Sequence, residues 1–282
     1  MRIDFHTHST ASDGSDTPLE LLLGADSAGL THIAMTDHDT LFGVRSAMQN
    51  RPPSNLKLLA GIELSCSGFP GKCHILGLGI DPFCATFEEN LSVVQAGRLA
   101  RNTLIASRLT QLGIECHLAD VAKYAHDDGV IGRPHFAQWL IDSGHCRDMN
   151  HAFKAYLGDN AKAYMPVDTL SPEDGIRIIH AAGGKAYIAH PMLLRLKAQE
   201  TIEQRIRSLK AYGLDGMEVF YPEHTPAQSE MLIRLSAKYD LTMTGGSDYH
   251  GRHRPDNHLG RVTDGLPVPT EFIDPFLLES AT

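Results

Sequence analysis

The sequence lacks any long apolar run. Among its 282 residues no stretch approaches the ~18 consecutive apolar residues that a membrane-spanning helix needs. Its start, Met1-Arg2-Ile3-Asp4, leads straight into expected structure and shows no signal-peptide pattern. We therefore expect a cytoplasmic protein that does not bind membranes.

Cysteine is also sparse. The five cysteines are an odd number and contain no C-x-x-C pair, so neither a disulfide framework nor a zinc-thiolate site is expected. Cys66 and Cys73 could face each other across a hairpin, but unpaired thiols in a reducing compartment are the expectation.

Positive charge is in short supply. The formal net charge of −9 argues against a surface that coats nucleic acid, because phosphate backbones attract basic faces. Binding of roughly three divalent cations would bring the balance to about −3 and make the local field positive. A small phosphate-bearing substrate is therefore still allowed, and nothing in the sequence points to an obligate protein partner.

The pattern along most of the chain alternates short apolar runs with amphipathic segments, joined by short links. This alternation predicts an α/β protein whose parallel strands form a sheet or barrel. Polar residues that follow such strands meet at one end of a barrel, where chemistry gathers. The expected strands after the opening one are 32–35, 56–62, 73–78, 185–189, 216–220 and 241–245, and the expected helices are 18–28, 44–49, 171–182, 202–212 and 226–239.

One segment interrupts this pattern. A long helix is expected over 87–112, and the chain from there to about 165 is helical and loop-like. We interpret 99–166 as an inserted helical cap that binds substrate, and 1–98 with 167–282 as the barrel. The tail after Arg254 contains scattered proline and glycine, and irregular structure is expected there.

Histidines and acids follow the expected strands. His6 and His8 are spaced i, i+2, as are Asp248 and His250, and this spacing points both side chains of a pair to one face of an extended chain. A single histidine of this kind is more often a packing or surface residue, so the evidence is the repeated position. The full set of candidate metal ligands is His6, His8, Asp13, His38, Glu63, His74, His190, Asp248 and His250.

Imidazole and carboxylate ligands without thiolate suit Mn²⁺, Zn²⁺ or Fe²⁺, with Mg²⁺ also open, and a carboxylate such as Glu63 can bridge two ions. Two ions ~3.5–4 Å apart can hold a hydroxide and stabilise charge on a phosphoryl group. Bound water then has a pKa near ~7, so no separate base is needed. The set therefore predicts hydrolysis of a phosphate ester with two or three divalent ions.

These motifs also carry a family resemblance. H-T-H-S with Asp13, T-D-H-D, G-I-E, His74, A-H-P and S-D-Y-H, in this order, resemble the motif set of the PHP (polymerase and histidinol phosphatase) family. The resemblance implies a distorted (β/α)7 TIM-like barrel and a centre of three ions, typically Mn²⁺. The implied ligands are His6, His8, Glu63 and Asp248 for one ion, Asp13, His38 and His250 for a second, which makes these three the catalytic residues, and Glu63, His74 and His190 for a third.

The inserted segment is similar to that of stand-alone family members that act on nucleotides. It contains A-R-N at 100–102 and G-R-P-H at 132–135. The resemblance implies removal of the 3′-phosphate from nucleoside 3′,5′-bisphosphates. A second phosphate needs an anchor away from the ions, and arginine offers bidentate contacts to it. We assign substrate binding to Asp13, Arg101, Asn102, Arg133 and His135, although arginines on a long helix are commonly solvated and His135 could instead bind an ion.

Other functions stay open at this stage. The same centre suits a 5′→3′ exoribonuclease on short RNA or a histidinol-phosphate phosphatase, and a metal-binding fold can also serve as a non-enzymatic nucleotide sensor. Glu218, at a strand end, is an outside candidate for the site, and Asp37 and Asp39 are expected to orient ligands. Phe136, Trp139 and Tyr221 could stack on a base, though aromatic residues are more often core.

Overall fold

The computed structural model describes residues 1–51, 55–68, 73–125, 129–166 and 169–282. Seven strands form one sheet in sequence order, from β1 to β7. Their bounds are β1 Ile3–Asp4, β2 His32–Met35, β3 Lys57–Cys66, β4 Cys73–Leu78, β5 Lys185–Ile188, β6 Gly216–Phe220 and β7 Thr242–Gly245.

The sheet curls until its two edges meet. The Phe5 amide donates to the Gly245 carbonyl at 3.2 Å, and Thr7 forms a parallel bridge with Tyr249 just beyond β7. The (β/α)7-like barrel expected from the sequence is confirmed, and its nearly closed sheet places the strand ends around one centre.

Most neighbouring strands are parallel, but β4 runs antiparallel to both β3 and β5. The hairpin between β3 and β4 puts Cys66 opposite Cys73, and both are free thiols, as expected. This reversal is one of the distortions of the barrel. It carries Glu63 and His74 into the same region from two adjacent strands.

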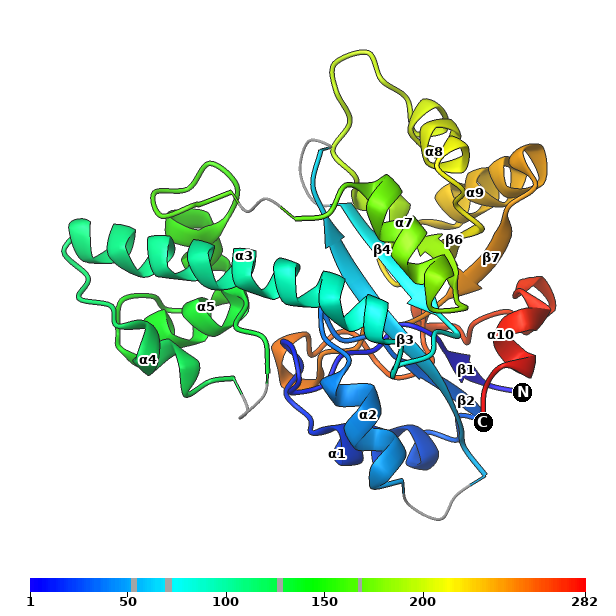
Figure 1. Cartoon of the computed structure of the whole chain (residues 1–282), viewed down its shortest axis with the longest axis horizontal. Coiled ribbons are helices and arrows are strands. Elements are labelled where there is room, and N and C mark those ends of the chain that lie inside the picture. Colours follow the sequence, from blue (N-terminus) through cyan, green and yellow to red (C-terminus); the bar gives the residue numbers. More distant parts are fainter. Residues whose placement is uncertain (52–54, 69–72, 126–128, 167–168) are drawn as a thin grey trace.

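Helices cover the outside of the sheet (Figure 1). Several begin with the caps that the sequence suggests: Thr17, Ser171 and Thr225 each accept a hydrogen bond from the first turn, with proline following directly. The barrel helices are α1 Pro18–Ser27, α2 Phe42–Gln49, α7 Pro172–Ala181, α8 Ile202–Ala211 and α9 Pro226–Tyr239.

Helix α3 (Ala85–Gln111) extends from the barrel into the cap (Figure 1). Its first turns contribute Phe87 and Leu91 to the barrel core, and its later turns contribute Ile105 and Leu109 to a second core. The boundary expected between 98 and 99 therefore falls inside one continuous helix. The remaining cap helices are α4 Leu118–Ala122, α5 Arg133–Asp142, α6 Met149–Ala152 and a π-helical turn, Phe153–Leu157.

The C-terminal tail is more regular than expected. It contains two short 3-10 turns, Thr263–Gly265 and Thr270–Phe272, and a final helix, α10 (Pro275–Glu279), which Asp274 caps by accepting from the Phe276 amide. The last residue, Thr282, exchanges backbone hydrogen bonds with Leu58 on β3. Among the described helices, none is long and apolar enough to cross a membrane.

Candidate metal centre

The nine expected ligands lie together at one end of the barrel. Most of their side chains are buried. Three of them, those of Asp13, His38 and His74, are more than a tenth exposed. His6, His8, His38, His190, Asp248 and His250 follow strands, Glu63 and His74 lie within β3 and β4, and Asp13 lies in the turn after β1.

Close backbone packing fixes the first pair. A Cβ at Gly246 would lie 2.4 Å from the His6 amide nitrogen, so only glycine lets the chain after β7 approach the chain after β1 this closely. His6 and His8 are both buried, with ring centroids 5.2 Å apart. The spacing that the sequence showed thus places both rings in the same buried centre.

Glu63 lies at the middle of the cluster. Its Oε2 is 3.1 to 3.2 Å from one nitrogen each of three imidazoles, and its Oε1 is 2.7 to 3.0 Å from two more. The histidines around Oε2 are His6, His8 and His38, and those around Oε1 are His74 and His190. One carboxylate therefore connects five histidines, which suits a bridging role.

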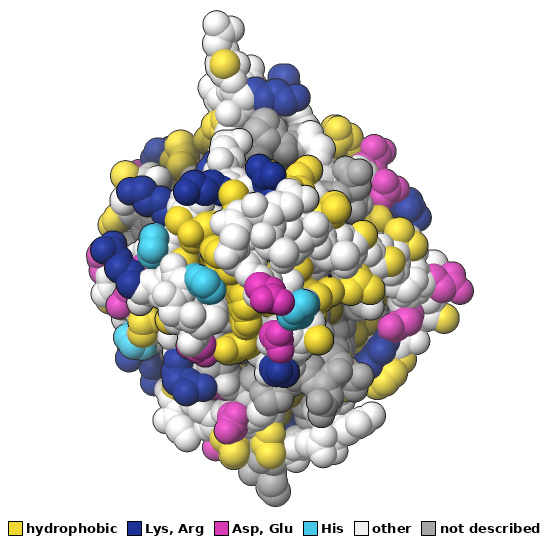
Figure 2. All heavy atoms as spheres, turned by 90° about the vertical axis from the view of Figure 1, so that its left-hand side faces the viewer, with side chains coloured by type: hydrophobic (Ala, Val, Ile, Leu, Met, Phe, Trp, Pro, Cys, Tyr) yellow, Lys and Arg dark blue, Asp and Glu magenta, His cyan; other side chains and the backbone are white. Residues whose placement is uncertain are grey.

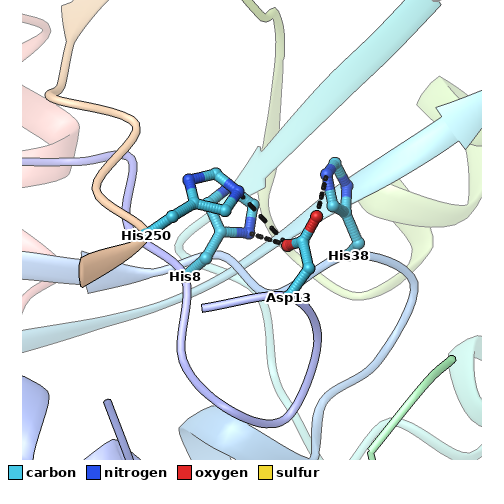
Figure 3. Close-up of side chains that lie close together, drawn as sticks. All are labelled: His8, Asp13, His38 and His250. Atoms are coloured by element: carbon cyan, nitrogen blue, oxygen red, sulfur yellow. Dashed lines mark ion pairs between the residues drawn. The ribbon is translucent and has the colours of Figure 1, made fainter. Parts of the chain in front are cut away.

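Asp13 organises a second group (Figure 3). Its Oδ1 is 3.2 Å from His250 Nε2 and 3.8 Å from His8 Nδ1, while its Oδ2 is 3.9 Å from His38 Nε2. The carboxylate points between the imidazoles rather than to solvent (Figure 3). Three of these four side chains form the second ligand set implied by the family resemblance, and the structure adds His8.

The donor atoms of the cluster fit divalent cations. His6 Nε2, His8 Nε2, His38 Nδ1, His250 Nε2 and Asp13 Oδ1 are buried and have no hydrogen-bond partner among the described residues. Buried polar atoms without partners are rare, and metal coordination would satisfy all five.

Three groups bring their donor atoms within 4.8 Å of one another. The first, His6, His8, Glu63 and Asp248, matches the implied first site. The second is the group around Asp13 that Figure 3 shows. The third contains His38 where the resemblance implies His190, whose Nε2 is nevertheless 3.0 Å from Glu63. The groups are His6, His8, Glu63 and Asp248; His8, Asp13, His38 and His250; and His38, Glu63 and His74.

The charges of the cluster favour cations. Burial raises the pKa of Glu63, but the surrounding histidines, His38 foremost, outweigh it and hold that pKa well below its usual range. Burial lowers the pKa of His8, yet the adjacent carboxylates of Asp248 and Glu63 raise it to about 9. The carboxylates thus favour positive charge between them, which a divalent ion also supplies. Burial holds the pKa of His38 well below its usual value, so this ligand is a neutral imidazole.

Glu218 on β6 orients two of the histidines. Its Oε1 lies 2.9 Å from His6 Nδ1, and its Oε2 accepts the His190 amide at 2.7 Å. A carboxylate at Nδ1 keeps the proton there and leaves Nε2 facing Glu63 as a ligand. Glu218 therefore belongs to the site, where it orients His6. Its position at a strand end had made it a candidate in the sequence.

Asp37 and Asp39 also support the loops that carry ligands. Asp37 accepts from the Ser9 amide and from the hydroxyls of Ser9 and Ser12. Asp39 accepts from the Ser65 amide and pairs with Arg98. These contacts connect both acids to segments that carry candidate ligands, which agrees with their expected orienting role.

A cavity of about 760 Å³ opens from the cluster toward the cap. Its wall includes five arginines that approach from both parts of the protein. They are Arg98 and Arg101 on α3, Arg133 at the start of α5, Arg195 after β5 and Arg254 after β7.

The four cap residues expected to bind substrate differ in position. Arg101 and Arg133 line the cavity. Asn102 does not: its Oδ1 accepts from Arg101 at 2.8 Å and its Nδ2 donates to the Ile131 carbonyl. His135 lies behind the wall, where its Nδ1 accepts from the Gly132 amide at 2.8 Å. In this structure Asn102 and His135 position the wall, and their direct contact with substrate stays a prediction.

Three wall arginines, Arg98, Arg195 and Arg254, were missing from the sequence-based set. Arg254 pairs with Asp248, and the Tyr221 hydroxyl donates to the same carboxylate at 2.8 Å. Arg254 could have been recognised in the sequence, because it follows the candidate ligand His250 by four residues. Arg195 lies in a loop with no motif, and its place in the wall depends on the fold. Of the three aromatic candidates only Tyr221 lines the cavity, while Phe136 and Trp139 pack in or against the cap core.

The sequence matches the PHP domain family model over residues 4–165. The chain belongs to the PHP domain family. It is 35% identical to a 5′-3′ exoribonuclease of Haemophilus influenzae, over 96% of this chain and 99% of that protein. It is 32% identical to a 3′,5′-nucleoside bisphosphate phosphatase of Chromobacterium violaceum, over 94% of this chain and 93% of that protein.

Solved structures agree with this membership. An amidohydrolase from Chromobacterium violaceum with bound sulfate superposes with a TM-score of 0.87 at 31% identity, covering 99% of this chain and 96% of that one. A proposed metal-dependent phosphoesterase from Bifidobacterium adolescentis gives 0.85 at 31% identity, covering 98% and 94%. The PHP protein described here is a metal-dependent phosphoesterase, and the family resemblance seen in its motifs is confirmed.

Proposed function

We propose that this PHP protein hydrolyses the 3′-phosphate of nucleoside 3′,5′-bisphosphates, such as adenosine 3′,5′-bisphosphate, and leaves the 5′-monophosphate. One observation carries the proposal: a single cavity joins the nine-residue cluster to a cationic wall on the cap. A substrate with two phosphates can place one at each end. The bisphosphate phosphatase from Chromobacterium violaceum, similar over nearly the whole chain, supports this choice among phosphate esters.

The cluster would hold two or three divalent ions through the nine ligands. Imidazole and carboxylate donors without thiolate favour Mn²⁺, with Zn²⁺, Fe²⁺ and Mg²⁺ as alternatives. Such ions polarise a phosphoryl oxygen and lower the pKa of bound water to about 7.

The protein's own groups then bind and orient the substrate. Glu63 and Asp13 fix the imidazoles in one arrangement, and Arg254 brings a guanidinium beside Asp248 at the cavity wall. Arg101 and Arg133 face the same cavity from the cap. Burial, with Arg98 and Arg133 nearby, lowers the pKa of Arg101 to about 9, so it still carries its charge at neutral pH. These arginines would contact the phosphate that is not hydrolysed.

The test compares phosphate release from adenosine 3′,5′-bisphosphate and from histidinol phosphate, using manganese-loaded protein. The bisphosphate should give at least about a tenfold higher kcat/KM, since a single charge-assisted contact to its second phosphate supplies that factor. Preference for histidinol phosphate would contradict the proposal.

A second candidate function is stepwise 5′→3′ hydrolysis of short RNA. The 5′-3′ exoribonuclease of Haemophilus influenzae, 35% identical to this chain, favours it. On the face that Figure 2 shows, however, basic and acidic side chains are interspersed, whereas a long RNA needs a continuous basic track. Gel analysis of a 5′-phosphorylated oligoribonucleotide, with release of mononucleotides from one end, would establish this activity.

A further inference from the structure

The arginines of the cavity wall differ in how their charges are compensated. Arg98 is paired with Asp39, and Arg254 is paired with Asp248. Their positive charges are therefore balanced within the barrel. The other three arginines, Arg101, Arg133 and Arg195, lie farther toward the cap side of the cavity.

Asp159 lies between two of these three. Its Oδ1 is 3.3 Å from Arg133 Nη1, and its Oδ2 is 3.1 Å from Arg195 Nη1. Arg133 begins α5 of the cap, whereas Arg195 belongs to the barrel segment after β5. One carboxylate thus holds two guanidinium groups that approach the cavity from different parts of the protein.

The cap side of the cavity consequently carries an excess of positive charge. Among the described wall residues that the cap and the loop after β5 contribute, there are three arginines, Arg101, Arg133 and Arg195, and one carboxylate, that of Asp159. A phosphate monoester carries a charge of about −1.5 to −2 at neutral pH, which matches this excess. Arg133 is further fixed by the Leu157 carbonyl at 3.2 Å and by the Tyr164 ring below its guanidinium.

We propose that Arg195 is a specificity-determining residue that binds the non-hydrolysed phosphate of the substrate together with Arg133, an inference that rests on the proposed function. The ion pair with Asp159 occupies one guanidinium nitrogen of Arg195, and the planar group can bind phosphate through the others. Asp159 lies between the two arginines and does not itself bind the phosphate.

The experiment compares two substrates that differ by one phosphate: adenosine 3′,5′-bisphosphate and adenosine 3′-monophosphate. In Arg195→Ala the KM for the bisphosphate should rise about tenfold, as expected for one charge-assisted contact. The KM for the monophosphate and both kcat values should stay unchanged. Equal effects on both substrates, or no effect, would overturn the inference.

Two further variants separate phosphate binding from other roles. Lys197→Ala removes an exposed cation from the same loop, outside the cavity wall, and should change neither KM. Asp159→Ala breaks the same ion pair but keeps the Arg195 charge, so it should not raise the KM for the bisphosphate. If Asp159→Ala reproduces the Arg195→Ala defect, Arg195 serves only to tie the barrel loop to the cap.

A binding measurement keeps this inference distinct from the proposed reaction. If the wild-type protein does not hydrolyse the bisphosphate, the proposed function fails. Calorimetric titration of manganese-loaded protein with adenosine 5′-monophosphate then decides the role of Arg195. A roughly tenfold weaker affinity in Arg195→Ala supports it, while equal affinities, or no binding by the wild type, reject it.

Discussion

The two ends of the cavity are built differently. At the barrel end, negative and positive groups compensate each other closely, with Glu63 surrounded by histidines and Asp248 paired with Arg254. At the cap end, Arg133 and Arg195 share the carboxylate of Asp159, and Arg101 lines the same wall. We infer from this difference that the two ends of the cavity have different roles. The barrel end is preorganised for ions, and the cap end keeps surplus charge for the substrate.

Several loops of the barrel end contain strained backbone. Asp39, His190 and Asp248, all in loops of the barrel end, have φ values of 53°, 29° and 50° in the left-handed region. Each such residue costs about 1–3 kcal/mol and persists only where its surroundings fix it. His190 is fixed through its amide by Glu218, and Asp248 through its side chain by Tyr221. The folded barrel therefore stores strain where the ligands are.

The largest effect is expected at the centre of the barrel end. Glu63→Gln removes the charge that five imidazoles share, so ions should bind poorly and activity should fall at least about a hundredfold. Metal content by mass spectrometry and kcat measure both effects. Glu115→Gln, at an exposed cap position, is the matched control. Normal metal content with normal kcat would show that Glu63 is not a ligand.

A smaller loss of metal affinity is expected at Glu218, which contacts the candidate ligand His6. Glu218→Gln removes the charged acceptor that fixes the His6 tautomer, and such substitutions weaken metal binding about 10- to 100-fold. Competition with a chelating dye measures the affinity, and the exposed Glu223→Gln serves as control. If affinity is unchanged, Glu218 has a packing role only.

At the cap end the expected change is in KM alone. Arg133→Ala should raise the KM for adenosine 3′,5′-bisphosphate about tenfold with kcat nearly constant, because the residue contacts a phosphate remote from the reaction. Arg147→Ala, on the exposed surface of the cap, should have no effect. A fall in kcat at constant KM would place Arg133 in the chemistry instead.

The last expected effect is one of pH on the stability of the cap. Burial lowers the pKa of His135 to about 4, against 6.5 for an unperturbed histidine. The unfolded chain therefore binds the proton first, and stability is lost as pH falls from 6.5 toward 4, by on the order of 3 kcal/mol. Urea unfolding of wild type and His135→Gln at pH 7.5 and 4.5 should show a smaller pH dependence in the variant. Equal dependence would show that His135 is accessible to protons.

The ligand cluster was largely predictable from sequence, because strand ends converge in any barrel. His6 and His8, or Asp248 and His250, need only their i, i+2 spacing and an adjacent apolar run to be recognised. The barrel strands and caps followed from the same local patterns. Local signals of this kind depend on a few neighbouring residues, so they can be recognised without knowing how the chain packs.

The rest depends on contacts between distant segments. Nothing near Glu218 indicates that its partner is His6, and nothing near Arg195 indicates Asp159. Likewise, nothing near Asn102 indicates that its amide donates to the Ile131 carbonyl, and its contact with substrate stays a prediction. The helix α10 was missed because proline and glycine in the tail outweighed a short capped turn.

The meeting of the chain after β1 with the chain after β7 has a consequence for synthesis. His6 and His8 leave the ribosome well before Asp248 and His250, which follow them by about 240 residues. At about 5–20 residues per second, the opening histidines wait roughly 10 to 50 s for their partners. The group formed by His6, His8, Glu63 and Asp248 can therefore assemble only after β7 has emerged, and chains that terminate before β7 should lack it and be unable to turn over substrate.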